Sequence, residues 1–453
     1  MKRIFPSACA AAVIAGLSAS FAGPAAANAD KSDIDGIWQA QGYGFWLSVT
    51  GEEATIDQIT AGGCVSMASI KSVIRDGAVA RLQDITLNGM GGALGPLQGE
   101  LTLEEDRLLL DLGKANLISF TRADALPESC TNRPGSDALA SFDVLWHGFQ
   151  EHYAYFDLRG VNWDEMRATY RPQVTAETDD ETLLNIFIQM LGPLRDGHVS
   201  LITPEGQIAD DVLPEWAEGL EAEQMVNVVR NAFTLHAPEG TRPASSMGLG
   251  MTAEGLGYMT LINFDDALVA GEVTMASIMG ELLTAEPKMK ALVIDTRVNF
   301  GGSDLAGYAL AAQLTSDSVE IGNKAVWEQG RWHTDTPLTI QPANAHVWDG
   351  PVYLLTSGVT ISAAETFALA LSHFDNVTLV GAPSNGILSD MSFLTLPNGW
   401  AVSLSNERYL NAAGENFEGA GVPVDIAVPV LPEEIAAGRD RAYEAVLQHL
   451  AQN

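Results

Sequence analysis

The chain has 453 residues, too many for one hydrophobic core of ordinary size, so two or three domains are expected. Its apolar content of 47% is that of a folded globular protein. The formal net charge of -34 argues against binding to a nucleic-acid backbone or to an anionic lipid surface, because both require clustered Lys and Arg.

The first 29 residues have the pattern of a signal peptide. Lys2 and Arg3 precede an apolar stretch, and small residues follow it as far as Ala27-Asn28-Ala29, which fits the A-x-A cleavage rule. Ala25-Ala26-Ala27 is the alternative cleavage site. No later apolar run is as long as a membrane span. The expected protein is therefore exported, either to a periplasm or out of the cell.

Three cysteines occur, and Cys9 lies in the predicted leader. It precedes the end of the apolar stretch, so it is not a suitable lipoprotein attachment site. Cys64 and Cys130 remain as an even pair in an oxidising compartment, so a disulfide between them is expected, with two unpaired buried thiols as the alternative. The sequence has no CxxC, no HExxH and no clustered His and Cys ligands, so we expect no metal ion and no cofactor.

Residues 30–124 consist of short alternating runs between Gly-rich turns, which predict a small all-β domain. The opening Gly36-Ile37-Trp38 is similar to the first strand of lipocalin-like barrels. Residues 125–136 are rich in Pro, Ser and Asn and predict a linker.

Residues 137–204 predict a helical segment. Apolar residues recur at three-to-four spacing from Leu139 to Phe149, as on one face of a helix. A second helix is expected to start with a capping box from Thr178 to Glu181 and to end in a loop at Asp196-Gly197-His198. Residues 205–256 lack a convincing strand series and are interpreted as a connecting segment, with no convincing PDZ domain.

Strand-like and helix-like segments alternate over residues 257–453, which predicts an α/β core with crossover helices on a largely buried sheet. The fold class expected for the whole chain is therefore multidomain α/β, with a small N-terminal all-β domain and a helical segment before the core. Sites in such sheets are commonly built at the carboxyl ends of strands, where strand-to-helix loops lie.

Two of these loops have residues suited to chemistry. The loop "NFGGSD" contains Gly301 and Gly302, whose backbone N–H groups no side chain hinders. The loop "TSGVTISAAE" places Ser362 at the start of a helix, where unpaired N–H groups favour negative charge. A serine hydroxyl beside N–H donors is what acyl transfer requires. Ser362 and Glu365 also form a capping-box pattern, so helix initiation alone is the alternative explanation.

A serine nucleophile needs a base, and the basic residues narrow the choice. No lysine follows Ser362, since the last one in the chain is Lys324. The loop "RDGHVSL" offers His198 instead. His147 and His152 are five residues apart on a predicted helix and are interpreted as structural.

Four segments in chain order resemble the tail-specific, or carboxyl-terminal-processing, serine peptidase family: "ALVIDTRVNFGGSD", "VYLLTSGVTISAAETFALAL", "VGAPSNG" and "LPNGWAVSLSNERYL…GENFEGAGVPVDIAVP". The resemblance extends through "LRDGHVSL" and covers residues 137–429. One branch of the family uses a Ser–Lys pair, and its lysine position holds Ile387 here. The other branch is similar to the tricorn core and to interphotoreceptor retinoid-binding protein and uses a histidine from the D-G-H loop. This sequence resembles the second branch.

The resemblance implies a role for each residue of the two loops. Ser362 would be the nucleophile and His198 the general base. The N–H of Ala363 and the N–H of Gly301 or Gly302 would form the oxyanion hole.

A carboxylate in "ENFEGAGVPVD" would orient the imidazole. Glu418 is the choice that the resemblance favours, and Glu415 and Asp425 are the alternatives. The sequence departs from the tricorn-like pattern at Gly197, where that pattern has a serine before its histidine.

These features favour an exported serine endopeptidase that acts on small or unfolded peptides through an acyl-enzyme. The competing function is a catalytically silent protein that binds a hydrophobic ligand, because retinoid carriers share this fold branch. Without a convincing PDZ domain, recognition of substrate carboxyl termini is not expected. The substrate's identity, the oligomeric state and the role of the β domain are left open.

Overall fold

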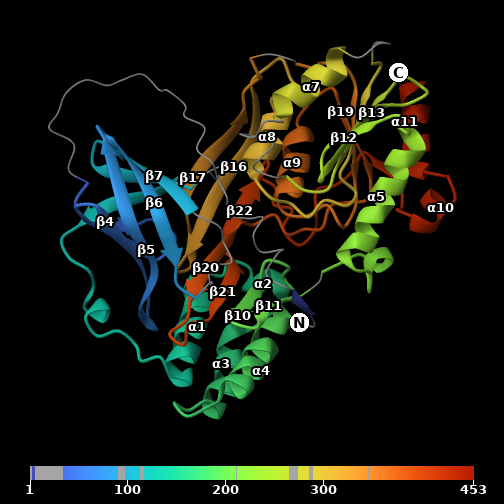
Figure 1. Cartoon of the computed structure of the whole chain (residues 1–453). Coiled ribbons are helices and arrows are strands. Elements are labelled where there is room, and N and C mark those ends of the chain that lie inside the picture. Colours follow the sequence, from blue (N-terminus) through green and yellow to red (C-terminus); the bar gives the residue numbers. More distant parts are fainter. Residues whose placement is uncertain are drawn as a thin grey trace. The chain divides into compact units, whose positions relative to one another are not determined.

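The computed structural model describes residues 3–5, 34–89, 97–112, 117–210, 212–264, 274–284, 289–344 and 347–452. The chain divides into two compact units. Their helices and strands are labelled in Figure 1. Unit 1 comprises Met1–Val212, Lys324–Thr336 and Ser389–Arg408; unit 2 comprises Leu213–Asn323, Pro337–Leu388 and Tyr409–Asn453.

Unit 1 begins with a closed antiparallel barrel of eight strands that pair in chain order, and the last strand pairs with the first. The strands are β2 (Gly36–Ala40), β3 (Phe45–Thr50), β4 (Glu53–Thr60), β5 (Gly63–Asp76), β6 (Val79–Leu87), β7 (Leu97–Glu104), β8 (Arg107–Asp111) and β9 (Ile118–Ala123). Alternate side chains point inward, and those of Trp38, Leu47, Leu101 and Phe120 are almost completely buried. The predicted N-terminal all-β domain is confirmed.

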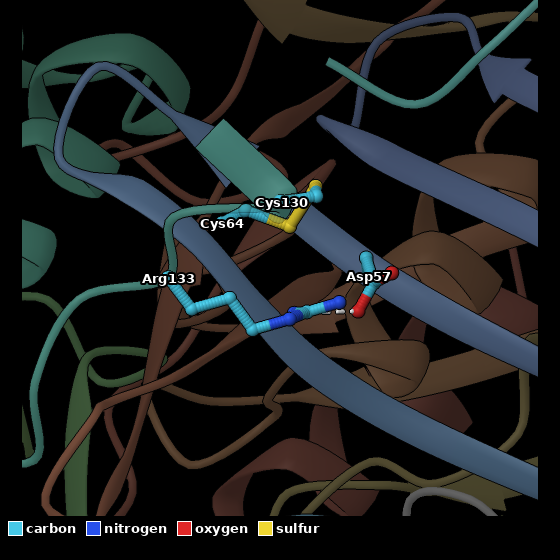
Figure 2. The surroundings of a disulfide bond; sticks show 4 residues. All are labelled: Asp57, Cys64, Cys130 and Arg133. Atoms are coloured by element: carbon cyan, nitrogen blue, oxygen red, sulfur yellow. Dashed lines mark ion pairs between the residues drawn. A yellow bond between two sulfur atoms is a disulfide. The ribbon is translucent and has the colours of Figure 1, made fainter. Parts of the chain in front are cut away.

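Cys64 on β5 and Cys130 at the end of the short helix η2 (Glu128–Cys130) form a disulfide (Figure 2). Next to it, Nη1 of Arg133 lies 2.9 Å from Oδ1 of the buried Asp57. The Asp57 carboxylate and the two sulfur atoms lie within 4.8 Å of one another, but oxidised sulfur atoms offer no thiolate ligand. The disulfide and the ion pair both fix the linker to the barrel.

Replacing Cys64 and Cys130 with serine should lower the free energy of unfolding of unit 1 by about 2–4 kcal/mol, because the disulfide closes a loop between residues 66 positions apart. Denaturant unfolding of the oxidised wild type and of the double variant tests this. Reductant should lower the free energy of unfolding of the wild type to that of the variant and should leave that of the variant unchanged. Equal stability of the two oxidised proteins would contradict the prediction.

The helical segment that follows consists of α1 (Ala138–His152), α2 (Phe156–Arg159), α3 (Trp163–Tyr170) and α4 (Asp180–Leu191). Their apolar faces enclose a core that includes the buried Phe142, Phe149 and Phe187.

The predicted capping box of the second helix is wrong. Asp179 is the N-cap of α4, and its Oδ1 accepts a hydrogen bond from the Thr182 N–H at 2.9 Å. Thr178 instead accepts a hydrogen bond from the Thr175 N–H. A carboxylate one position closer to the helix took the capping role that the S/T-x-x-E pattern had assigned to threonine.

A sheet in the order β1-β11-β10-β21-β20 completes unit 1. Its strands are β10 (Ser200–Thr203), β11 (Gly206–Ala209), β20 (Met391–Thr395), β21 (Ala401–Ser405) and β1 (Arg3–Phe5). The last of these pairs with β11 and falls inside the predicted leader. Residues 6–29 lie outside the described residues, so the leader stays a prediction.

Unit 2 is built on a seven-stranded sheet in the order β12-β13-β14-β15-β18-β19-β23. The strands are β12 (Thr241–Ala244), β13 (Met247–Met251), β14 (Gly257–Leu261), β15 (Leu292–Asp295), β18 (Val352–Thr356), β19 (Val377–Gly381) and β23 (Ile426–Ala427). From β14 to β23 every neighbouring pair is parallel. The parallel register places the carboxyl ends of β15 and β18 at the same edge, where the two candidate loops begin.

Helices cover both faces of this sheet. The core on one face joins it to α7 (Met275–Thr284), α8 (Asp304–Ala311) and α9 (Ala363–Leu371). The core on the other face joins it to α5 (Ala222–His236) and α11 (Arg441–Leu450). The predicted α/β core with crossover helices is confirmed.

Residues 205–256, interpreted as a connecting segment without a convincing strand series, do contain strands: β12 and β13 extend the sheet, and α5 packs on it. The strand β13 has the sequence MGLGM, in which glycines hide the alternation of a strand. A Cβ on Gly248 would lie 2.8 Å from Thr260 Oγ1, so close strand packing explains this glycine.

Three further strands, β16 (Val319–Glu328), β17 (Arg331–Ile340) and β22 (Glu407–Leu410), form a small sheet, and each contributes residues to both units. The helix α10 (Pro432–Ala436) precedes α11. No helix in the described part of the chain is long and apolar enough to cross a membrane.

Candidate active site

Ser362 lies in unit 2 at the sharp turn between β18 and α9, where it is the N-cap residue of the helix. Its φ of 58° and ψ of -123° lie outside the regions that non-glycine residues prefer, which costs on the order of 1–3 kcal/mol. The side chain is partly exposed. A strained strand-to-helix turn that presents a serine hydroxyl is the arrangement known as a nucleophile elbow.

The carboxylate of Glu365 stabilises this turn through hydrogen bonds. Its Oε2 accepts hydrogen bonds from the N–H groups of Ser362 (3.1 Å) and Ile387 (2.9 Å), and its Oε1 accepts from the Gly386 N–H (2.6 Å) and Ser384 Oγ (2.7 Å). Burial raises the pKa of Glu365 to about 7, although these four hydrogen bonds favour the ionised form. Glu365 thus connects the serine turn to the loop in which the Ser–Lys branch would have its lysine.

Helix capping and nucleophilic attack can therefore coexist at Ser362. Both halves of the capping box are present, but the Glu365 N–H also donates to the Ser362 carbonyl oxygen at 2.7 Å. The Glu365 N–H is therefore shared between the hydroxyl and the carbonyl oxygen of Ser362, as is common at helix termini.

Gly301 lies directly against the serine. A Cβ built on Gly301 would lie 2.7 Å from Ser362 Cβ and 3.2 Å from the Ala363 nitrogen, and its φ of 86° suits glycine. The next residue, Gly302, has a φ of 132°, and a Cβ there would lie 2.1 Å from the carbonyl oxygen of Phe264. Both glycines are thus required by close backbone approach as well as by φ.

The structure narrows the choice of oxyanion donors. The Gly301 N–H donates to Asn299 Oδ1 at 2.9 Å, so this N–H is already used and the candidacy of Gly301 as a donor is corrected. Within the described residues, the N–H groups of Gly302 and Ala363 have no acceptor. A parallel bridge between Asn299 and Thr360 joins the two loops that hold these donors. No sequence pattern singled out Asn299, whose side chain accepts the Gly301 N–H.

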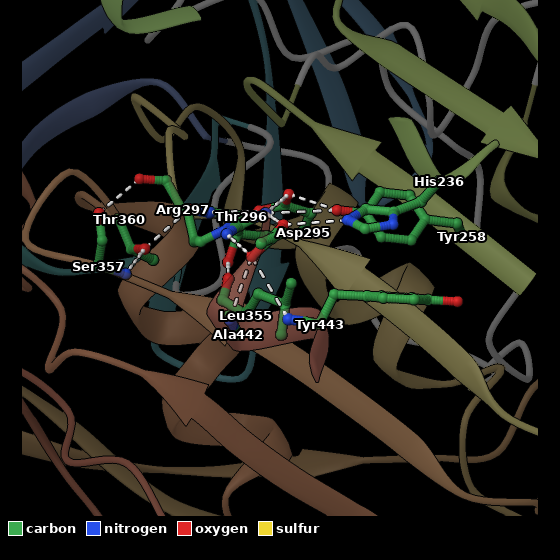
Figure 3. Close-up of polar contacts among 11 residues, drawn as sticks. His236, Tyr258, Asp295, Thr296, Arg297, Leu355, Ser357, Thr360, Ala442 and Tyr443 are labelled. Atoms are coloured by element: carbon green, nitrogen blue, oxygen red, sulfur yellow. Dashed lines mark hydrogen bonds and ion pairs between the residues drawn. The ribbon is translucent and has the colours of Figure 1, made fainter. Parts of the chain in front are cut away.

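A buried ionic network anchors the glycine loop where it leaves β15 (Figure 3). The Arg297 guanidinium bonds Asp295 at 3.0 and 2.7 Å and Asp440 at 2.9 and 2.8 Å, and all three side chains are almost completely buried. Burial opposes the charge of Arg297, but the two carboxylates raise its pKa well above the ordinary value. Tyr258 and His236 complete the network through Asp295 and Asp440.

The backbone next to this network is bonded to the serine loop. Ser357 Oγ donates to the Arg297 carbonyl oxygen at 2.5 Å, and Thr360 Oγ1 donates to the Thr296 carbonyl oxygen at 2.7 Å. Arg297 therefore acts on the site by positioning both loops.

His198 lies in unit 1, in the loop between the helix η4 (Gly192–Leu194) and β10. Asp196 holds this loop: its Oδ1 accepts a hydrogen bond from the His198 N–H at 2.9 Å, and its Oδ2 accepts one from the Tyr153 hydroxyl at 2.9 Å. Ser403 Oγ donates to the His198 carbonyl oxygen at 2.7 Å. The backbone of His198 is thus fixed on both sides within its own unit.

The three candidate carboxylates differ in burial. Glu418 is buried, and its Oε2 accepts a hydrogen bond from the Leu388 N–H at 2.8 Å. Glu415 and Asp425 are exposed and bonded to Asn411 and to the Leu379 N–H. The assignment of Glu418 as the orienting group stays a prediction, like that of His198 as the base.

Replacing Gly302 with alanine should lower kcat for the peptide hydrolysis that the sequence resemblance implies by about 10²–10³, the effect of removing one oxyanion donor. The new Cβ would displace the backbone, since it would otherwise overlap Phe264 O. Gly438→Ala is the matched control, because its φ is 88° but nothing lies within 4 Å of the added Cβ. Steady-state kinetics on a peptide substrate test this. Full activity of Gly302→Ala would rule out its N–H as a donor.

The chain is similar in sequence to two protein-family models and in fold to solved structures. Residues 255–428 match the model of peptidase family S41, and residues 136–192 match the model of the tricorn protease C1 domain. A Parabacteroides merdae protein described as a peptidase is 24% identical over 69% of this chain and 96% of its own, with a TM-score of 0.59. Mature CPAF complexed with lactacystin is 14% identical over 70% of this chain and 99% of its own, with a TM-score of 0.52. Both solved structures show the same fold.

Proposed function

The chain belongs to peptidase family S41, the tail-specific serine peptidases, and from this premise we propose that Ser362 and His198 carry out its peptide hydrolysis. The observation that carries the proposal is the turn at Ser362, where a strained serine lies against Gly301. The N–H groups of the adjoining Gly302 and Ala363 have no acceptor among the residues that the structure describes.

In the proposed reaction, Ser362 Oγ attacks the scissile carbonyl carbon while His198 takes the hydroxyl proton. The negative charge moves to the carbonyl oxygen, which accepts hydrogen bonds from the N–H groups of Gly302 and Ala363. The carbon–nitrogen bond then breaks, and the amine leaves with the proton from His198. Water repeats these steps on the acyl-enzyme and releases the acid.

The proposed orienting group for His198 is Glu418. Its support is its burial, which the two alternative carboxylates do not share. Replacement of the lysine of the other branch by Ile387 also supports a histidine as the base, because isoleucine cannot accept a proton.

The proposed substrates are small or unfolded peptides, since their backbones are free to enter a site built from strand-to-helix loops. We also propose that the protein is exported, on the strength of the leader-like residues 1–29.

A fluorophosphonate probe tests the proposal, because it reacts covalently only with an activated serine. Mass spectrometry of the labelled wild type should find the adduct on Ser362, and labelling should slow greatly in His198→Ala. Ser372→Ala, which changes a serine at the other end of α9, is the control and should label normally. A folded wild type that stays unlabelled would overturn the proposal and favour the ligand-binding alternative.

A further inference from the structure

Two large apolar side chains close in sequence to Gly301 and Gly302 are exposed. Within the described residues, only six large apolar side chains are exposed: Ile74, Leu117, Leu158, Leu235, Phe300 and Leu305. Two of them, Phe300 and Leu305, lie within five residues of each other, and each is 37% exposed. They flank Gly301 and Gly302, and Gly301 contacts Ser362. Single exposed apolar residues need no explanation, but two so close in sequence to the glycines of a candidate site do.

The backbone of Phe300 is held in place, so its exposure is a property of the fold. The Phe300 N–H donates to the Ile262 carbonyl oxygen at 2.9 Å. On either side, the Asn299 N–H donates to Val359 O and the Gly301 N–H donates to Asn299 Oδ1, both at 2.9 Å. The side chain of Asn299 is completely buried, whereas that of Phe300, the next residue, is exposed.

Leu305 is exposed although the residues on both sides of it are buried. It is the second residue of α8, and its neighbours Asp304 and Ala306 are buried. The Asp304 carboxylate faces inward, where it accepts hydrogen bonds from Thr366 Oγ1 (2.7 Å) and the Tyr409 hydroxyl (2.8 Å). The nearest carboxylate along the chain therefore adds no exposed charge to the surface of Phe300 and Leu305.

We infer that Phe300 and Leu305 form the apolar wall of the subsite for the substrate residue that supplies the scissile carbonyl, so that the enzyme prefers a large aliphatic or aromatic side chain there. This inference rests on the proposed function. The carbonyl oxygen would bond the N–H of Gly302, and the side chain of the same substrate residue is attached one carbon away. Phe300 is only two residues from Gly302, so the Phe300 ring can reach the side chain of a substrate residue bound there.

Cleavage of a peptide series that differs only at this substrate position tests the inference. Wild type should prefer Leu or Phe over Ala by about 10- to 200-fold in kcat/KM, the range for apolar pocket contacts. The preference should fall to a few-fold in Phe300→Ala and in Leu305→Ala and should persist in Phe300→Leu. Because each ratio is taken within one variant, a general loss of activity cancels.

Leu235→Ala is the control, since Leu235 is equally exposed but lies on α5. Its ratio should equal that of the wild type. A wild type that cleaves with no apolar preference, or a preference unchanged in both alanine variants, would overturn this inference alone. A folded wild type that neither cleaves peptides nor reacts with the fluorophosphonate would overturn the proposed function as well.

Discussion

Replacing Ser362 with alanine should lower kcat for peptide hydrolysis by a factor on the order of 10⁶, because the variant cannot form the acyl-enzyme. The N–H donors beside it would remain and could sustain only a small residual rate over water. Kinetics on a peptide with an apolar residue before the scissile bond measures the loss. Ser372→Ala should keep the wild-type rate, because within the described residues its hydroxyl bonds only the Leu369 carbonyl oxygen.

The backbone strain at Ser362 also predicts a difference in stability between two variants of this residue. Alanine cannot relieve a φ of 58°, whereas glycine adopts it freely. Ser362→Gly should therefore be more stable than Ser362→Ala by about 1 kcal/mol, and both should be inactive. Residual activity above a tenth of the wild type in either variant would exclude Ser362 as the nucleophile.

Replacing Arg297 with methionine should lower the free energy of unfolding of unit 2 by about 3–5 kcal/mol, because the buried carboxylates of Asp295 and Asp440 lose the guanidinium that balances their charge. Activity should fall as well, since the Arg297 carbonyl oxygen is bonded to the serine loop. Thermal unfolding and peptide kinetics on the same preparations measure both effects.

The triple variant with Asp295→Asn and Asp440→Asn should recover part of the stability, because it removes the unpaired charges. Arg439→Ala is the control, since Arg439 forms only exposed ion pairs. Burial opposes ionisation of Asp440, but Arg297 holds its pKa well below the usual value. Its stabilisation is therefore present above the ordinary carboxyl pKa and is lost as the pH falls below it. An unchanged melting temperature of Arg297→Met would show that the network is dispensable.

Much of the candidate site could be predicted from the sequence because it depends on local chemistry. Ser362 at a helix start and the glycine pair after a buried strand are patterns of a few consecutive residues. Their order along the chain was enough to predict the peptidase family and the α/β core, and the comparisons and the fold confirmed both. The disulfide between Cys64 and Cys130 could be predicted from the number of cysteines, because only these two remain outside the predicted leader.

Other features depend on atoms that come together only on folding. The sequence offers Gly301 and Gly302 as equal donors, and the Asn299 side chain excludes the first. Arg297 and Asp440 are 143 positions apart, so no local pattern could pair them. Strand β13 was missed because its glycines pack against neighbouring elements and leave no alternation.

The sequence by itself thus determined the kind of chemistry and the residues that could perform it, because reactivity belongs to side-chain type and local backbone. The tertiary structure alone decided which N–H groups have no acceptor within the described residues, which carboxylate is buried and which apolar side chains close in sequence to the glycine pair stay exposed. These properties depend on what neighbouring elements leave uncovered, and parallel strands bring such elements together from distant parts of the chain.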